Sequence, residues 1–168
     1  FITMDDLLDE VPKDAARYFF IMRNTSSHLD FDLDLARAQS MDNPVWYIQY
    51  AHARCCSIFR QAEAAGISGG AWAQADLTLL AEPGELDLVR KMAAFPDEVL
   101  SAAIERAPSR IAKYGLDVAS VFHSFYNECR VISDDTALTV ARLALVDAAK
   151  TVIANALNIM GIAAPERM

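Results

Sequence analysis

The sequence has no long apolar run, and its first residues include no basic cluster. None of its hydrophobic stretches approaches the roughly 18 to 20 uninterrupted apolar residues that a membrane-spanning helix needs. Where a signal peptide would have its basic region, the sequence has carboxylates, at Asp5, Asp6, Asp9 and Glu10. We therefore expect a globular chain with no membrane partner. Because a starting Met is missing as well, we expect it to be a piece of a longer protein.

Cysteine is scarce, with three residues at Cys55, Cys56 and Cys129. Adjacent cysteines on a helix are poor disulfide partners, so a reducing cytoplasm is the expected location. His52, Cys55 and Cys56 could offer metal ligands at helical spacing, but no second closely spaced pair completes a zinc pattern. We therefore expect three small core residues and no metal site in this chain.

Basic residues are also in short supply. The formal net charge of −8 argues against a general nucleic-acid binder, because affinity for phosphates comes mostly from Lys and Arg. The acid excess is uneven, with a net −5 in residues 1–42 and −3 in the longer segment 43–168. A protein that recognises a few unpaired bases by stacking needs only a local basic rim. Four arginines could form that rim: Arg54, Arg60, Arg130 and Arg167.

The spacing of apolar residues predicts a mainly all-α protein, an antiparallel helix bundle after a short helical and extended segment. Two short helices are expected at 5–11 and 14–22, packing through Leu7, Leu8, Tyr18, Phe19 and Ile21. Residues 29–35 alternate apolar side chains with aspartates, which predicts a half-buried strand or extended segment. Further helices are expected at 44–65, 77–80, 85–94, 96–106, 108–131 and 135–160.

The helix that starts at Asn43 carries the most informative residues. Asn43 is a good N-cap, and Pro44 fits the first helical position. Apolar residues from Val45 onward recur at spacings of three and four and predict a buried face. Tyr47, Tyr50 and Arg54 follow the same spacing on a flank of that face. Two rings and a guanidinium on one flank suit unpaired bases, although a mixed helix flank would show the same pattern.

Two further motifs point to other chemistry, and their surroundings argue against both. Residues 66–70 match G-x-S-x-G around Ser68, but a hydrolase elbow needs a strand before the serine and a helix directly after it. Here a long helix is expected to run into Gly66, and the motif is expected to lie in the loop that follows this helix. Asp30, Asp32 and Asp34 copy the first ligands of a calcium loop, but no Gly or closing Glu follows at the required positions.

Several segments together resemble the C-terminal part of bacterial arginyl-tRNA synthetase. They are Asn43-Pro44, Gln49 to Arg54, Phe122 to Val131 (FHSFYNECRV) and the ending Ala164 to Met168, with further likeness in 1–3, 14–20 and 28–36. The resemblance spans nearly the whole chain. It implies that residues 1–42 connect to a preceding class I catalytic domain and that residues 43–168 form an anticodon-binding helical domain.

The resemblance also implies the function and the site. The parent protein would be an arginine-tRNA ligase that uses ATP and Mg²⁺, whereas this part would need no cofactor and would only recognise the anticodon loop of tRNA(Arg). We expect a monomer whose other partner is its own catalytic domain. The implied anticodon-binding residues are Tyr47, Tyr50, Arg54, Tyr126, Asn127, Arg130 and Met168. The alternative is a helical protein-interaction module without RNA binding.

Overall fold

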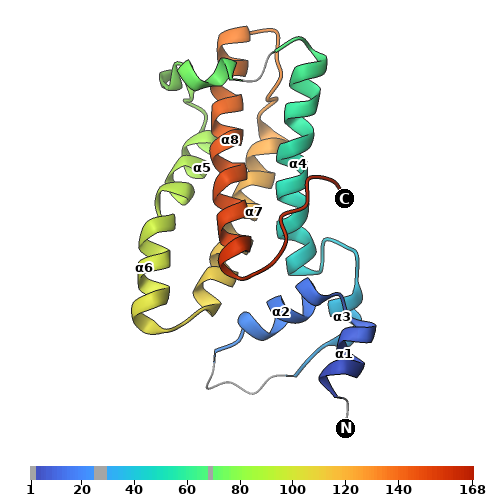
Figure 1. Cartoon of the computed structure of the whole chain (residues 1–168). Helices are drawn as coiled ribbons and strands as arrows, with labels where there is room; N and C mark the ends of the chain where they lie inside the picture. The colour runs from blue at the N-terminus through green and yellow to red at the C-terminus, as the bar shows by residue number, and fades with distance from the viewer. Residues whose placement is uncertain (1–2, 25–29, 68–69) are drawn as a thin grey trace.

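The chain folds into a series of helices, seen here in a computed structural model that describes residues 3–24, 30–67 and 70–168 (Figure 1). Three short helices come first: α1 (Met4–Glu10), α2 (Lys13–Ile21) and α3 (Leu33–Arg37). The bundle follows, with α4 (Pro44–Ala64), the 3-10 turns η1 (Ala71–Gln74) and η2 (Leu77–Leu79), α5 (Pro83–Ala93), α6 (Phe95–Glu105), α7 (Ser109–Glu128) and α8 (Thr136–Ile159). The described ranges contain no strand, so the prediction of an all-α helix bundle is confirmed. None of the helices in these ranges is long and apolar enough to cross a membrane.

Three long helices, α4, α7 and α8, pack against one another and form the centre of the molecule (Figure 1). Their facing surfaces bury apolar side chains completely, among them Ile48, Phe122, Phe125, Leu143, Ile153 and Leu157. Gly115 on α7 faces Ile48 on α4, and a Cβ at this position would lie 3.4 Å from Ile48 Cδ1, at van der Waals distance. Helices α5 and α6 cover the side of α7. This packing fixes the exposed faces of α4 and α7 beside each other.

The short N-terminal helices pack against the end of the bundle (Figure 1). Tyr18 is buried and its hydroxyl donates a hydrogen bond to the Ala112 carbonyl, 3.1 Å away, which ties α2 to α7. Leu7 and Phe19 are buried as predicted, but Leu8 is 45% exposed. The prediction for Leu8 was wrong because α1 is a short helix with only one buried position.

A half-buried strand or extended segment was predicted at 29–35, and the described residues 30–35 form no strand, although the backbone of Asp32 is extended. Residues 30–32 have no regular structure, and α3 begins at Leu33. The Asp32 carboxylate accepts a hydrogen bond from the Leu35 amide at 2.9 Å and caps this helix. An aspartate before a helix satisfies an orphan amide, and acidic residues in the first turn favour the helix dipole. These local terms outweigh an alternation that is too short to build a sheet without a partner strand.

Asn43 caps α4 as predicted and also connects it to α3. Its side-chain oxygen accepts from the Val45 amide at 3.2 Å, while its amide group donates to the carbonyls of Ala36 and Ala38. The residue is buried, so these bonds satisfy its polar atoms away from water. The start of the helix that carries the predicted site is therefore held in place on both sides.

Candidate nucleic-acid interface

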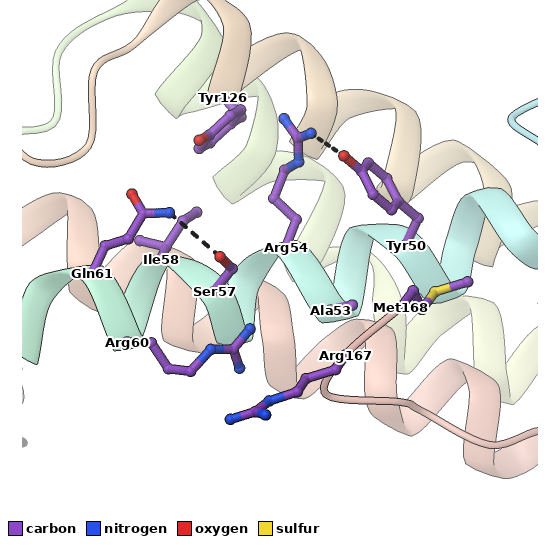
Figure 2. A pocket seen from close by; sticks show the side chains of 10 residues that line it. All are labelled: Tyr50, Ala53, Arg54, Ser57, Ile58, Arg60, Gln61, Tyr126, Arg167 and Met168. Atoms are coloured by element: carbon purple, nitrogen blue, oxygen red, sulfur yellow. Dashed lines mark hydrogen bonds between the residues drawn. The ribbon is translucent and has the colours of Figure 1, made fainter.

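Arg54 lies between two tyrosine rings in the middle of α4 (Figure 2). Its guanidinium carbon is 4.8 Å from the centroid of the Tyr50 ring and 4.6 Å from that of Tyr126. Its Nη2 also donates a hydrogen bond to the Tyr50 hydroxyl. Tyr50 is one turn away on α4, whereas Tyr126 comes from the last turns of α7. We call these three residues the Arg54 cluster.

Tyr47 lies beside this cluster and faces α7. Its ring meets that of His123 edge-on, with centroids 4.7 Å apart and an interplanar angle of 65°. The Tyr50 ring is stacked on the same histidine at 5.8 Å and 29°. Both tyrosines are half-buried. The predicted flank of α4 therefore packs partly against α7 and leaves the remaining ring surface open.

The C-terminal tail is held along α4. Gly161 ends α8 with φ 68°, in the left-handed region that glycine favours, and the Ile162 amide donates to the Leu157 carbonyl at 3.0 Å. Side chains of α4 then bind the tail backbone at successive points: Gln49 to the Ala163 carbonyl, His52 Nδ1 to the Pro165 carbonyl, both at 2.9 Å, and Arg60 to the Glu166 carbonyl at 3.2 Å. These bonds place Arg167 and Met168 beside the Arg54 cluster (Figure 2).

Three adjoining hollows surround the Arg54 cluster. The tail hollow, of about 450 Å³, is lined by Tyr50, Ala53, Arg54, Ser57, Ile58, Arg60, Gln61, Tyr126, Arg167 and Met168 (Figure 2). The loop hollow, of about 540 Å³, is lined by Ile58, Gln61, Ala65, Tyr126, Asn127, Glu128, Cys129, Arg130, Val131 and Ile132. The His123 hollow, of about 670 Å³, is lined by Gln39, Ser40, Met41, Trp46, Tyr47, Tyr50, Arg54, His123, Asn127 and Met168.

The structure brings all seven predicted site residues to these hollows. Tyr50, Arg54 and Met168 line both the tail hollow and the His123 hollow. Tyr47 lines the His123 hollow, and Arg130 lines the loop hollow. Tyr126 and Asn127 each line two of the three. Their place is therefore known, while their role in binding RNA stays a prediction.

The hollows carry local positive charge in an acidic chain. Within residues 3–24, 30–67 and 70–168, no carboxylate forms an ion pair with Arg54, Arg60, Arg130 or Arg167. The predicted basic rim is thus spread over the three hollows: Arg54, Arg60 and Arg167 line the tail hollow, and Arg54 also lines the His123 hollow. Arg130 lines the loop hollow, where Glu128 is a further lining residue. Unpaired guanidinium groups are suited to phosphate and to the faces of bases.

A buried ion pair supports the wall that carries Arg130. Arg142 Nε lies 2.6 Å from Glu85 Oε1, and the Glu85 side chain is completely buried. Arg142 also donates through Nη1 to the Arg130 carbonyl at 2.9 Å. The second carboxylate oxygen of Glu85 accepts from the Glu82 amide at 2.9 Å. One guanidinium therefore joins α8, α5 and the start of the loop between α7 and α8.

Several residues that line the hollows were not among the seven predicted anticodon-binding residues, including Ser57, Gln61, Arg167 and His123. Ser57 and Gln61 continue the three- and four-residue spacing that starts at Tyr50, so the helical stripe could have identified them. Arg167 had been noted only as a rim cation. His123 belongs to the FHSFYN segment but its position between two tyrosine rings depends on how α7 packs on α4.

Cys55 and Cys56 are protonated thiols and His52 contacts a backbone carbonyl, whereas metal ligands are deprotonated and face one another. Burial raises the pKa of the Cys55 thiol and, to a lesser degree, that of Cys56, which keeps both protonated. His52 is engaged with the Pro165 carbonyl. Across the described residues, no group of three His, Cys, Asp or Glu side chains could hold a metal ion. Ser68, the serine of the G-x-S-x-G match, lies outside the described residues.

Comparison with known protein families explains this arrangement. Residues 48–168 match the family described as the DALR anticodon binding domain. This chain belongs to that family. The match begins inside α4 at Ile48 and runs through the C-terminal tail, so it leaves Tyr47 outside but includes most of the residues lining the three hollows.

Known relatives match this chain of the DALR family over its whole length, including the residues before the family match. It is 54% identical over its whole length to an arginine–tRNA ligase of Symbiobacterium thermophilum, of which it spans 30%. A crystal structure from Campylobacter jejuni, assigned to arginyl-tRNA synthetase, matches the whole chain with a TM-score of 0.90 at 32% identity, over 36% of that protein. The arginyl-tRNA synthetase of Thermus thermophilus matches 92% of the chain with a TM-score of 0.78 at 33% identity, over 26% of its own length. The family resemblance found in the sequence is confirmed.

Proposed function

We propose that this chain recognises the unpaired anticodon loop of an arginine tRNA, as part of a longer arginine-tRNA ligase. The observation that carries the proposal is the Arg54 cluster, a guanidinium held between two rings at the meeting point of the hollows. A base stacked on an aromatic ring contributes about 1 to 3 kcal/mol. Two or three such contacts would supply much of the affinity, while hydrogen bonds to the base edges would discriminate between anticodons. The family and the ligase relatives support this function, and they do not favour a protein-interaction module.

Each wall of the site would contribute differently. The rings of Tyr47, Tyr50 and Tyr126 would stack on splayed bases, and Met168 would close the edge of the tail hollow. Arg54, Arg60 and Arg167 would meet the phosphates around them. Asn127 is exposed where two hollows meet, so its amide could pair with a base edge.

Catalysis would take place outside this chain. The chain spans 30% of the length of its curated relatives, and we propose that the remainder of the parent protein uses ATP and Mg²⁺ to couple arginine to the tRNA. No residue of this chain is assigned to ATP or Mg²⁺. Contacts with the correct anticodon would then stabilise the productive complex with the cognate tRNA more than the complex with another tRNA. Binding energy used in this way raises the rate for the right substrate.

The proposal is tested by fluorescence anisotropy with synthetic anticodon stem–loop RNAs. The protein should bind an arginine anticodon more tightly than the same RNA with all three anticodon bases replaced, at one fixed salt concentration. The affinity should also fall with added salt, with a logarithmic slope of about −2 if three arginines each neutralise one phosphate of the loop. Equal affinity for the two RNAs would refute anticodon recognition.

A further inference from the structure

His123 is a buried polar residue at the floor of the predicted site. It is 9% exposed and lies on α7, in contact with the rings of Tyr47 and Tyr50 from α4. It lines the His123 hollow together with Met168 and Asn127. The fold therefore places an imidazole between the two tyrosines that are expected to stack on RNA bases.

One nitrogen of this ring has no partner. Within the described residues, His123 Nε2 is fully covered and makes no hydrogen bond. Leaving a buried polar atom unsatisfied is costly, and native proteins satisfy most such atoms. Among the described side chains, the only other buried polar atom without a hydrogen bond is Arg110 Nε, and Arg110 lines none of the three hollows. The free nitrogen in the site therefore calls for a partner from outside the chain.

The ring is uncharged at neutral pH. Burial, together with a smaller effect of the nearby Arg54 guanidinium, lowers the pKa of His123 to about 4, although an interaction with the Tyr47 backbone opposes the shift. A neutral imidazole has little attraction for phosphate, and Arg54 already provides a cation for that group. Whichever tautomer is present, Nε2 offers either a lone pair or an N–H, which suits the edge of a base.

We propose that His123 is a specificity-determining residue that forms a hydrogen bond through Nε2 with the edge of an unpaired base in the His123 hollow. This inference rests on the proposed function, since it assigns one more contact to the same RNA. Because Nε2 is covered in the free protein, a neighbouring side chain must move before a base can reach it, and we assign this movement to Tyr50, whose ring is stacked on the histidine. Tyr50 is half-buried and is held there by stacking and by its bond to Arg54, so RNA that engages Arg54 would release it.

The first test replaces the hydrogen-bonding ring by an apolar ring of similar shape. His123→Phe should lower affinity for the arginine anticodon about three- to tenfold, and should leave the melting temperature unchanged or raised, because a buried unpartnered nitrogen is removed. Three RNAs that each replace one anticodon base identify the contact. For the RNA in which the contacted base is replaced, the wild type and His123→Phe should bind with the same affinity. For the other two RNAs, His123→Phe should still bind more weakly than the wild type. Ser124→Ala, an exposed change on the same helix, is the matched control and should behave as wild type.

The second test observes the nitrogen directly. The protein is labelled with ¹⁵N-histidine for NMR, and the sequence has three histidines. The signal of residue 123 is the one that is missing from the spectrum of His123→Phe. Its Nε2 chemical shift should move on addition of the arginine anticodon RNA and not with the replaced anticodon. An unmoved signal, or an equal loss of affinity for every RNA, would overturn the inference. If wild-type protein does not discriminate between anticodons at all, the proposed function has failed first, and the two failures are thereby distinguished.

Discussion

Replacing Arg142 by Met should destabilise the bundle strongly, because it leaves the Glu85 carboxylate buried without its cation. The side chains of Arg142 and Glu85 are 10% and 0% exposed, and their closest atoms are 2.6 Å apart. Met has a similar length and no charge, so the change removes the ion pair while it fills most of the space. It also removes the donor that the Arg130 carbonyl now uses.

The expected loss follows from the burial of this pair. Removing one partner of a buried ion pair costs about 3 to 5 kcal/mol, because the remaining charge cannot be hydrated. For a domain of this size each kcal/mol shifts the melting temperature by about 2 to 4 °C, so the melting temperature should fall by about 6 to 20 °C. The control is Arg90→Met, which breaks an ion pair with Asp87 of the same 2.6 Å length whose side chains are 69% and 62% exposed. That change should shift the melting temperature by no more than about 3 °C.

Thermal unfolding followed by circular dichroism at pH 7 measures both variants. The double variant Arg142→Met with Glu85→Gln should recover most of the loss, because a neutral amide oxygen can still accept from the Glu82 amide. If Arg142→Met is no less stable than Arg90→Met, burial of the pair does not contribute as argued. If the double variant is no more stable than the single one, the loss comes from packing and not from the unpaired carboxylate.

Three further predictions concern the site and its supports. Arg54→Lys keeps the charge but not the planar group between two rings, so anisotropy should show about tenfold weaker binding of the arginine anticodon RNA with an unchanged salt slope. Arg90→Lys, an exposed change away from the hollows, is the control and should bind as wild type. Because the pKa of His123 is about 4 in the folded state and about 6.5 in the unfolded state, the unfolded chain binds the extra proton between these pH values. The free energy of unfolding should therefore fall as pH drops from 6.5 to 4, and His123 should contribute at most about 3 kcal/mol to this fall. In urea titrations of His123→Phe across the same pH range, the contribution of His123 to the pH dependence should be absent. Gly161→Ala should cost about 1 to 2 kcal/mol and weaken RNA binding through the tail, because φ is 68° and an L side chain is strained there. The added Cβ would meet the end of the flexible Arg17 side chain, which can move aside. Equal urea midpoints would contradict this prediction.

Helix positions could be predicted from the sequence because their signals are local. Asn43 and Pro44 mark the start of α4, and Asp135 accepts from the Leu138 amide at the start of α8. Capping depends on residues within a single turn, so neighbours in the sequence are sufficient to find it. The exception is α3, where a period-two pattern and a good N-cap competed, and the cap determined the structure.

The site could be predicted only in part. The four-residue spacing of Tyr50 and Arg54 placed them on one flank of a helix, and the structure shows their hydrogen bond. The second ring on Arg54, from Tyr126, is 72 residues away in the sequence, and its contact depends on how α7 packs on α4. The same packing buries His123 between the tyrosines, which no local pattern indicates.

The sequence by itself determined that this chain is a helix bundle with an aromatic and basic flank on α4, and its motifs indicated the family. These features come from periodicity, caps and residue type, which act over a few neighbouring residues. Only the tertiary structure decided that α7 and the C-terminal tail meet at that flank, with Arg142 and Glu85 holding one wall and Gly161 turning the tail back. The physical reason is that these contacts join residues far apart in the chain, where burial and packing between helices, not local propensity, determine which side chains meet.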